Sequence, residues 1–147
     1  MTEFDLRNFL PYLLNQAAEA SSLEFQKMYK DRYGMLRTEW RVLFHLGMFG
    51  RMTARDIGLA ARIHKTKISR AVQRLSERRY MVRHRDADDR RQEHLELTAA
   101  GRAVYDDLRG VAQAYDQRLA AQLSEPEARV LRRALQKLAR TEPARFT

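Results

Sequence analysis

Apolar residues recur at helical spacing along the first part of the chain. Between about residues 8 and 33 they lie mostly three, four or seven positions apart, at Leu10, Leu13, Leu14, Ala17, Phe25, Met28 and Tyr29. This spacing predicts one long amphipathic helix. Asn8 is a candidate N-cap, Pro11 would lie in the first turn, where a missing N–H costs little, and Gly34 would end the helix.

Two shorter helices are expected next. Thr38 is a candidate cap for a helix that Gly50 ends, with apolar contacts at Trp40, Leu43, Phe44 and Leu46. Thr53 and Asp56 form a variant of the capping box, with Asp in place of the usual Glu or Gln. They predict a helix that runs to about Arg62.

After a tight break at Ile63-His64, a further helix is expected from Lys65 to about Arg79. Its apolar positions follow the i, i+3, i+4, i+7 pattern at Ile68, Ala71, Val72 and Leu75. With those four turned to the core, the outward positions are Thr66, Arg70, Gln73 and Glu77. Two short helices joined by a tight turn are typical of a helix-turn-helix.

The hydrophobic period then changes. Residues 80–85 and 92–97 read as two short strands, because polar and apolar residues alternate in the second at His94, Leu95, Glu96 and Leu97. The charged segment 86–91 joins them into a hairpin. Thr98 is expected to cap a long helix whose apolar stripe is Val104, Leu108, Val111, Tyr115 and Leu119. Ser124 and Glu127 predict the start of a last helix, with Leu131, Leu135 and Leu138 on one side.

These elements predict a mainly α protein with a small β-hairpin: a winged helix-turn-helix with long N- and C-terminal dimerisation helices. We expect residues 1–147 to form a single domain. Residues 38–98 would be the DNA-binding lobe, and residues 1–37 and 99–147 the dimerisation helices.

The charge balance favours a polyanionic partner. Lys and Arg number 28 against 19 Asp and Glu, a net charge of +9. Nucleic acid is the first candidate and an anionic membrane surface the second, while a surface that merely carries excess cations is the plain alternative. With no cysteine, structural disulfides, Cys-ligated zinc and thiol redox sensing are excluded. No apolar run approaches the roughly 18 residues of a membrane span, so a cytoplasmic protein without a membrane partner is expected.

The helix after the break carries side chains that bind bases and phosphates. The candidates for major-groove contacts are Lys65, Thr66, Lys67, Ser69, Arg70, Gln73 and Arg74. Arg and Lys can bind guanine O6 and N7, and Gln can bind adenine N6 and N7. A solvated basic face is the alternative. The hairpin that follows favours the DNA interpretation, because Arg90 and Arg91 at its tip could enter a minor groove.

Four segments in fixed order mark the stretch 59–101: Lys65-Thr66-Lys67-Ile68-Ser69-Arg70, Leu75-Ser76-Glu77-Arg78, the segment 86–91, and Leu95-Glu96-Leu97-Thr98-Ala99-Ala100-Gly101. Within them, Asp89-x-Arg91 is followed by Leu97-Thr98-x-x-Gly101. This combination resembles the MarR family of bacterial transcription regulators, and the order of helices agrees over almost the whole chain. The chain departs from the family at Arg62-Ile63-His64, which lacks the glycine of many members, and at Arg78-Arg79-Tyr80, which replaces a common Arg-Gly pair.

The resemblance implies roles for the wing residues. Arg91 would be the minor-groove arginine. Asp89 would shape the wing by pairing with an arginine, for which Arg70, Arg74 and Arg85 are the candidates. The expected function is a sequence-specific DNA-binding transcription regulator, a ligand-responsive repressor at a pseudo-palindromic operator.

The long terminal helices predict a homodimer. A winged core of roughly 60 residues cannot cover three additional amphipathic helices, and a two-fold interface would bury them. An intramolecular bundle of the three helices is the alternative. The resemblance implies the dimer, with its recognition helices about one turn of DNA apart.

The resemblance also implies a small-molecule effector, bound between the dimerisation helices and the DNA-binding lobe. The candidate pocket residues are Met28, Tyr29, Trp40, Arg41, Phe44, His45 and Met48. Arg41 or His45 would meet an anionic or phenolic ligand, such as an aromatic acid. The alternative is that the aromatic residues are ordinary core.

Enzymes and helical scaffolds are the competing classes. Four histidines are present, yet they form no triad, phosphate loop or HExxH pattern. His84 and His94 lie on the two wing strands and could approach each other, but a metal site would need further ligands. A helical partner-binding module would explain the long helices but not the wing arginines. No enzyme activity, cofactor or metal is therefore expected.

Overall fold

The computed structural model describes residues 3–89 and 91–139. Its elements follow the predicted order closely. They are η1 (Leu6–Asn8), α1 (Leu10–Tyr33), α2 (Arg37–Phe49), β1 (Met52–Thr53), α3 (Ala54–Ala61), α4 (Lys65–Glu77), β2 (Met81–Arg85), β3 (Glu93–Leu97), α5 (Ala99–Ala120) and α6 (Glu125–Leu138). The expected mainly α fold with a small β-hairpin wing is confirmed.

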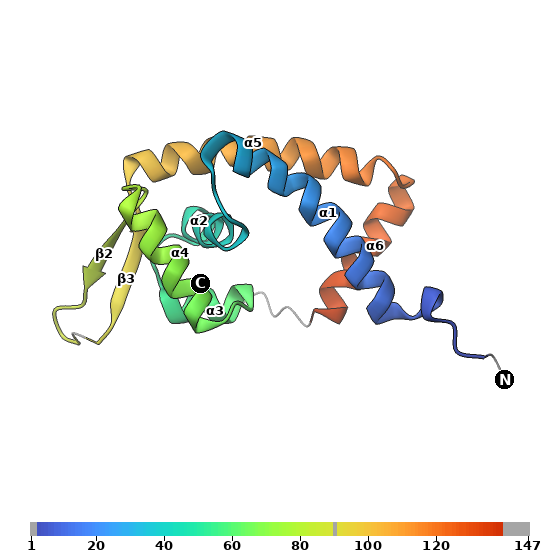
Figure 1. The fold of residues 1–147 in the computed structure, drawn as a ribbon, viewed down its shortest axis with the longest axis horizontal. Helices are drawn as coiled ribbons and strands as arrows, with labels where there is room; N and C mark the ends of the chain where they lie inside the picture. Colours follow the sequence, from blue (N-terminus) through green and yellow to red (C-terminus); the bar gives the residue numbers. More distant parts are fainter. Residues whose placement is uncertain (1–2, 90, 140–147) are drawn as a thin grey trace.

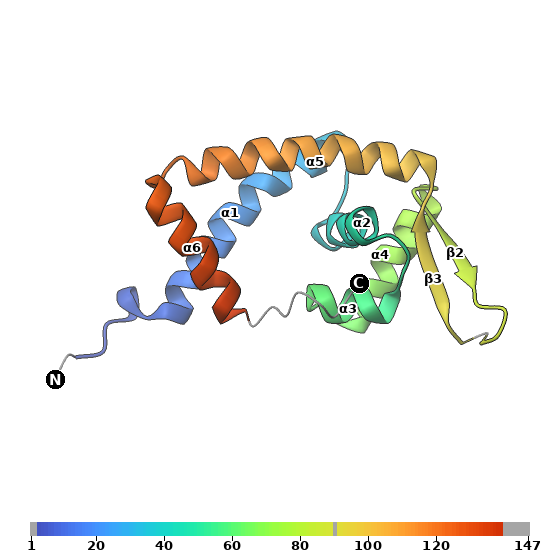
Figure 2. The same ribbon diagram turned by 180° about the vertical axis from the view of Figure 1, so that it is seen from behind.

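The long helix α5 connects two halves of the molecule (Figures 1 and 2). Helices α2, α3 and α4 lie below one end of it, where α5 follows the hairpin of β2 and β3, which extends away from the helices. At the other end α1 and α6 lie beneath it. None of the helices in the described ranges is long and apolar enough to cross a membrane.

The wing is part of a three-stranded antiparallel sheet with the order β1-β3-β2. In β1, Met52 pairs with Leu95, and across the hairpin Met81 pairs with Leu97. Strand β1 has only two residues, too few to show an alternating pattern, and was not predicted from the sequence. Its pairing attaches the hairpin to the start of α3.

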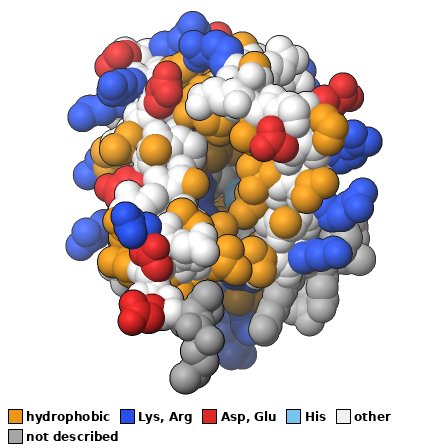
Figure 3. Space-filling view, turned by 90° about the vertical axis from the view of Figure 1, so that its right-hand side faces the viewer, with side chains coloured by type: hydrophobic (Ala, Val, Ile, Leu, Met, Phe, Trp, Pro, Cys, Tyr) orange, Lys and Arg blue, Asp and Glu red, His pale blue; other side chains and the backbone are white. Residues whose placement is uncertain are grey.

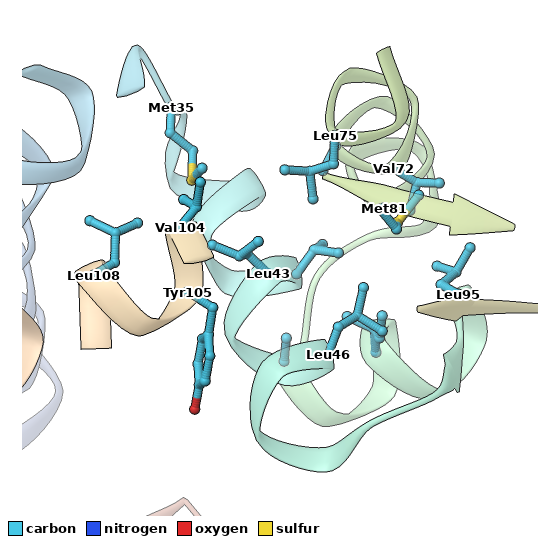
Figure 4. Packing of buried hydrophobic residues seen from close by; sticks show 14 of the residues in the cluster. Met35, Leu43, Leu46, Val72, Leu75, Met81, Leu95, Val104, Tyr105 and Leu108 are labelled. Carbon is cyan, nitrogen blue, oxygen red and sulfur yellow. The ribbon is translucent and has the colours of Figure 1, made fainter. Parts of the chain in front are cut away.

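The core lies between α2, α4, α5 and the sheet (Figure 4). Leu43 and Leu46 of α2 are buried against Leu75 of α4 and against Met81 and Leu95 of the two wing strands. The four predicted inward positions of α4 are all buried, at Ile68, Ala71, Val72 and Leu75. Burial of this face turns the polar face of α4 to solvent.

Two helix starts differ from the predictions. Asp5 caps the 3-10 turn η1, so α1 begins at Leu10 with Phe9 as its N-cap instead of Asn8. Helix α2 begins at Arg37, and a carboxylate oxygen of Glu39 accepts a hydrogen bond from the Leu36 N–H at 2.5 Å. A buried acidic side chain in the first turn therefore replaces the expected Thr38 cap. Helix α4 ends at Glu77, two residues before the expected Arg79.

The remaining caps are confirmed. Thr53 with Asp56, Thr98, and Ser124 with Glu127 begin α3, α5 and α6, and Gly34 ends α1 at φ 60°. The two places without the family's glycine are left-handed all the same, with Arg62 at φ 55° and Arg79 at φ 63°. An arginine there costs roughly 1 kcal/mol relative to glycine, and the surrounding contacts must offset that cost.

Candidate nucleic-acid interface

Helix α4 presents its N-terminal half to solvent. Its N-cap is His64, whose ring nitrogen Nδ1 accepts a hydrogen bond from the Thr66 N–H at 3.2 Å. All seven predicted contact residues are exposed: Lys65, Thr66, Lys67, Ser69, Arg70, Gln73 and Arg74. A helix N-terminus with exposed cations and hydroxyls is suited to bind phosphates and base edges.

A groove of about 810 Å³ separates α4 from the wing. Ser69 and Gln73 line its helix side, and Arg91 lines its wing side. The rest of the lining is Thr53, Ala54, Arg55, Asp56, Val72, Arg83, Gln92, Glu93, His94 and Leu95. The fold thus brings Ser69 and Gln73, two of the seven predicted helix residues, together with Arg91 on one concave surface. Arg70 and Arg74 are exposed but lie outside the groove lining.

Asp89 orders the tip of the wing through Arg91. Its Oδ1 accepts a hydrogen bond from the Arg91 N–H at 3.0 Å and lies 3.9 Å from the Arg91 Nε. The next N–H, of Gln92, donates to the Asp89 carbonyl oxygen at 3.0 Å. The partner is therefore Arg91 and not Arg70, Arg74 or Arg85, because a turn of this kind needs only neighbouring residues. Arg90, the other predicted tip arginine, lies outside the described residues.

This turn leaves the Arg91 side chain almost wholly in solvent, 95% exposed. The backbone is held at both ends of the tip, since the Asp86 N–H donates to the Gln92 carbonyl at 3.1 Å. A held backbone with an exposed guanidinium reduces the entropy lost on binding.

The outer face of the wing carries a small charged cluster. Glu96 Oε2 accepts hydrogen bonds from Arg51 Nε at 3.2 Å and interacts with His84 Nε2 at 2.9 Å. The Arg51 guanidinium, helped by His84, holds the pKa of Glu96 below its usual value. His84 does lie opposite His94, as predicted. In the part of the chain that the structure describes, no group of three or more potential ligands is placed to hold a metal ion.

Two hydrogen bonds of the Gln73 side chain were not predicted from the sequence. Arg83 Nη2 donates to the Gln73 Oε1 at 3.2 Å, and the Gln73 Nε2 donates to Glu77 Oε1 at 3.0 Å. Arg83 is in β2, and no local pattern signals that it meets a residue of α4.

The end of α4 is anchored to the end of α1 and, through Tyr33, to α5. Arg78 donates to the carbonyl oxygens of Tyr33 and Gly34, the latter at 3.1 Å. The Tyr33 hydroxyl in turn donates to Asp107 of α5 at 2.5 Å, and this bond raises the pKa of Tyr33 to about 12. Arg32 completes the group by pairing with Asp107 at 3.0 Å. Three helices are thereby joined at one point.

A second cavity, of about 320 Å³, lies between α1, α2 and α5. Of the seven predicted pocket residues, Tyr29, Trp40 and Arg41 line it. The rest of the lining, which the sequence analysis did not identify, is Ser21, Ser22, Phe25, Arg37, Ala112, Tyr115, Asp116 and Leu119. Phe25 and Tyr115 lie on different helices, so only packing shows that they stack, with ring centroids 5.7 Å apart.

The other four predicted pocket residues do not line this cavity. Met28 packs on the core, and Phe44 packs between Trp40 and Tyr105. His45 Nδ1 interacts with the Arg41 carbonyl oxygen at 2.6 Å, and Met48 is 71% exposed. The helical turn directs them to other faces of α1 and α2.

The cavity is aromatic with a cationic side. Arg41 also donates to the Ala61 carbonyl oxygen at the end of α3, and burial lowers the pKa of Arg41. The one acid of the lining, Asp116, is paired with Arg132 at 2.8 Å. Arg37 and Arg41 therefore set the sign of charge that the cavity favours.

The terminal helices leave apolar faces uncovered. Leu131, Leu135 and Leu138 of α6 are 45%, 41% and 57% exposed, and Leu10 and Leu13 of α1 are also exposed. Figure 3 shows hydrophobic side chains on two sides of a hollow at this end of the molecule, with charged side chains around the rim. Monomeric proteins rarely leave such faces open.

The fold and the exposed basic helix and wing define a winged helix-turn-helix DNA-binding protein. Residues 33–92 match the model of the MarR family. Over these residues the chain resembles the MarR family, whose members are transcriptional regulators and not enzymes. It is a DNA-binding transcription regulator.

Solved structures agree with this assignment. A MarR family transcriptional regulator from Silicibacter pomeroyi is 28% identical, with a TM-score of 0.79 over 92% of this chain and 99% of that one. BpsR of Bordetella bronchiseptica is 22% identical, with a TM-score of 0.86 over 96% and 100% of the two chains. MepR of S. aureus, solved with DNA, is 21% identical, with a TM-score of 0.79 over 93% and 97%. A search of curated proteins found no match.

Proposed function

We propose that this regulator is a ligand-responsive repressor that binds a pseudo-palindromic operator as a homodimer. The observation that carries the proposal is the groove between α4 and the wing, where Ser69 and Gln73 face Arg91. In this arrangement α4 enters the major groove, and Arg91 reaches the adjacent minor groove. The fold of MepR, which was solved with DNA, supports this mode of binding.

The homodimer follows from the uncovered faces of α1 and α6. A second copy related by a two-fold axis would cover the α6 face with an identical surface. It would also place two α4 helices on one side of the DNA. The proposed lobes are residues 38–98 for DNA and residues 1–37 and 99–147 for dimerisation.

Binding to a selected duplex tests this function. We expect the protein to enrich a pseudo-palindrome from a library of randomised double-stranded DNA, with half-sites about one helical turn apart. Inserting about five base pairs between the half-sites should abolish binding, because the second half-site then faces the opposite side of the duplex. Equal binding to all duplexes would contradict sequence-specific recognition. Transcription in vitro from a promoter that overlaps the selected site then separates repression from activation.

Arg70→Ala and Arg91→Ala should weaken binding in different ways. If Arg70 binds a base, its loss costs about 1–3 kcal/mol and relaxes the preference at one position. Loss of Arg91 should reduce the slope of log affinity against log salt concentration by about one unit. The loss of affinity should be largest on operators with A·T-rich flanks, whose narrow minor grooves attract arginine. Salt-dependent fluorescence anisotropy measures both. Binding by Arg91→Ala that equals wild type at every salt concentration would remove the wing from the interface.

The effector that this cavity favours is an aromatic acid. Trp40, Tyr29 and Phe25 offer ring faces, and Arg37 and Arg41 offer charge for a carboxylate. The DNA binding of BpsR is regulated by 6-hydroxynicotinic acid, a ligand of this class. The cavity touches α1, α2 and α5, and Arg41 extends from it to the end of α3. A bound anion would therefore act on the position of the DNA-binding lobe.

Trp40 is the single tryptophan of the chain and reports on the cavity directly. Titration with benzoate, salicylate or 6-hydroxynicotinate should change its fluorescence and release bound DNA at the same concentrations. Arg37→Ala should weaken the effect of each acid at least about tenfold, the loss expected for one charge-assisted hydrogen bond. The neutral amide benzamide is the control and should have little effect. If benzamide is as potent as benzoate, the cavity does not select anions.

A further inference from the structure

Arg83 of β2 is held between the recognition helix and the wing. Side chains alternate along a strand, so Arg83 lies on the same face of the sheet as the buried Met81 and is directed toward α4. One guanidinium nitrogen donates to the Gln73 Oε1 at 3.2 Å, and the other lies 3.8 Å from Glu93 Oε2 on β3.

These contacts give the Gln73 amide one orientation. A free glutamine amide can turn over and exchange its donor and acceptor ends at little cost. Here Arg83 can only donate, so the oxygen of the amide must face the wing. The ionised Glu77 can only accept, so the nitrogen must face the end of α4. The Gln73 amide keeps one free N–H and one free oxygen lone pair. Their relative positions in the groove are fixed.

We propose that Arg83 is a positioning residue that fixes which base Gln73 selects. This rests on the proposed function, in which Gln73 faces the major groove. A glutamine with a fixed acceptor and a fixed donor matches adenine, which offers the N6 amino group and the N7 acceptor. Guanine offers two acceptors, O6 and N7, and the oriented oxygen would face one of them. Without Arg83, only the contact with Glu77 orients the amide, and an amide that can break this one contact and turn over can donate its NH₂ group to guanine.

Arg85 is a matched control for Arg83. It has the same charge, lies two residues further along β2 on the same face, and is also exposed. Within residues 3–89 and 91–139, its guanidinium has no hydrogen bond or ion pair. Loss of Arg85 therefore removes a wing cation without touching Gln73.

The experiment uses the full chain and the duplex that wild type selects. The base pair assigned to Gln73 is the one at which Gln73→Ala relaxes the preference. At that base pair, Arg83→Ala should reduce the adenine-over-guanine ratio by about tenfold, the range of one bidentate contact. It should have no further effect in the Gln73→Ala background, because two residues acting through one contact are not additive. Arg85→Ala should leave the ratio unchanged.

Arg83→Lys separates positioning from charge. Lysine keeps the charge, but a single ammonium cannot reach Gln73 and Glu93 as the forked guanidinium does. The slope of log affinity against log salt concentration should therefore stay at the wild-type value, while the adenine-over-guanine ratio falls. Thermal unfolding of each variant checks that the wing is folded.

Three results would overturn the proposal. One is a uniform loss on all duplexes by Arg83→Ala, with the salt slope reduced by about one unit as for a phosphate contact. The second is an Arg83→Lys variant that keeps both the wild-type adenine-over-guanine ratio and the wild-type affinity for the selected duplex. The third is a further loss of ratio when Arg83→Ala is added to Gln73→Ala. If wild type selects no duplex at all, it is the proposed operator binding that fails, and this outcome is distinct from the three above.

Discussion

Replacement of Gly101 by alanine is expected to lower the free energy of unfolding by about 3 kcal/mol or more. A Cβ at this position would lie 1.9 Å from the Tyr80 carbonyl oxygen and 2.8 Å from its carbonyl carbon. Both are backbone atoms, so no side-chain rotation can relieve the overlap. The final glycine of the wing signature is thus required by the close approach of α5 to the chain that enters the wing.

The backbone around Tyr80 has little freedom to move away. The Thr98 N–H donates to the Tyr80 carbonyl at 3.0 Å, and the Thr98 hydroxyl donates to the Arg79 carbonyl at 2.6 Å. The same hydroxyl accepts the Gly101 N–H at 3.0 Å and caps α5. A shift of Tyr80 would break the first two bonds and disturb the left-handed Arg79.

Gly110→Ala is the control for Gly101→Ala. Gly110 lies in the same helix, and a Cβ there would meet nothing within 4 Å. Alanine should leave stability unchanged or raise it by up to about 1 kcal/mol, because glycine is unfavourable within helices. Urea unfolding of both variants measures the difference in their free energies of unfolding. The comparison requires that this free energy falls with urea concentration at the same slope in both. Equal stabilities of the two variants would show that α5 and the wing entry separate more easily than their hydrogen bonds suggest.

Leu131→Asp combined with Leu135→Asp is expected to convert the proposed dimer into monomers. The two leucines lie side by side on the uncovered face of α6, next to a groove that Leu119, Ala120 and Leu123 also line. Two carboxylates in a desolvated interface cost several kcal/mol each when they find no partner. Light scattering should report twice the 17.3 kDa chain mass for wild type and the single mass for the variant.

Operator binding should fail together with association. A dimer binds its second half-site as an intramolecular step, which raises affinity by a factor of about 10²–10⁴. The monomeric variant should lose that factor while its weak, salt-dependent binding to unrelated duplexes remains. Arg133→Asp, on the opposite side of α6, should remain dimeric. A wild-type protein that is monomeric at micromolar concentration would contradict the two-fold arrangement.

Much of the fold could be predicted from the residues because its determinants are local. Thr53 with Asp56 and Ser124 with Glu127 act over three residues, and the apolar positions of α4 repeat within two turns. The faces of the amphipathic helices and the hairpin follow from such short spacings. The basic helix face and Arg91 could be predicted for the same reason, and the ordered motifs 65–70 and 95–101 showed the resemblance to the MarR family.

The tertiary structure decided what depends on residues far apart in the chain. Strand β1 exists because Met52 meets Leu95, and the cavity proposed to bind an effector includes Phe25 and Tyr115 because α1 and α5 pack together. Arg83 meets Gln73 only because the tertiary fold places β2 beside α4. These contacts join residues that only the tertiary fold brings together, and no periodic pattern in the sequence signals them. Residue types and local spacing therefore determined the elements and the exposed basic face of α4, whereas packing determined which polar groups meet, and in which orientation.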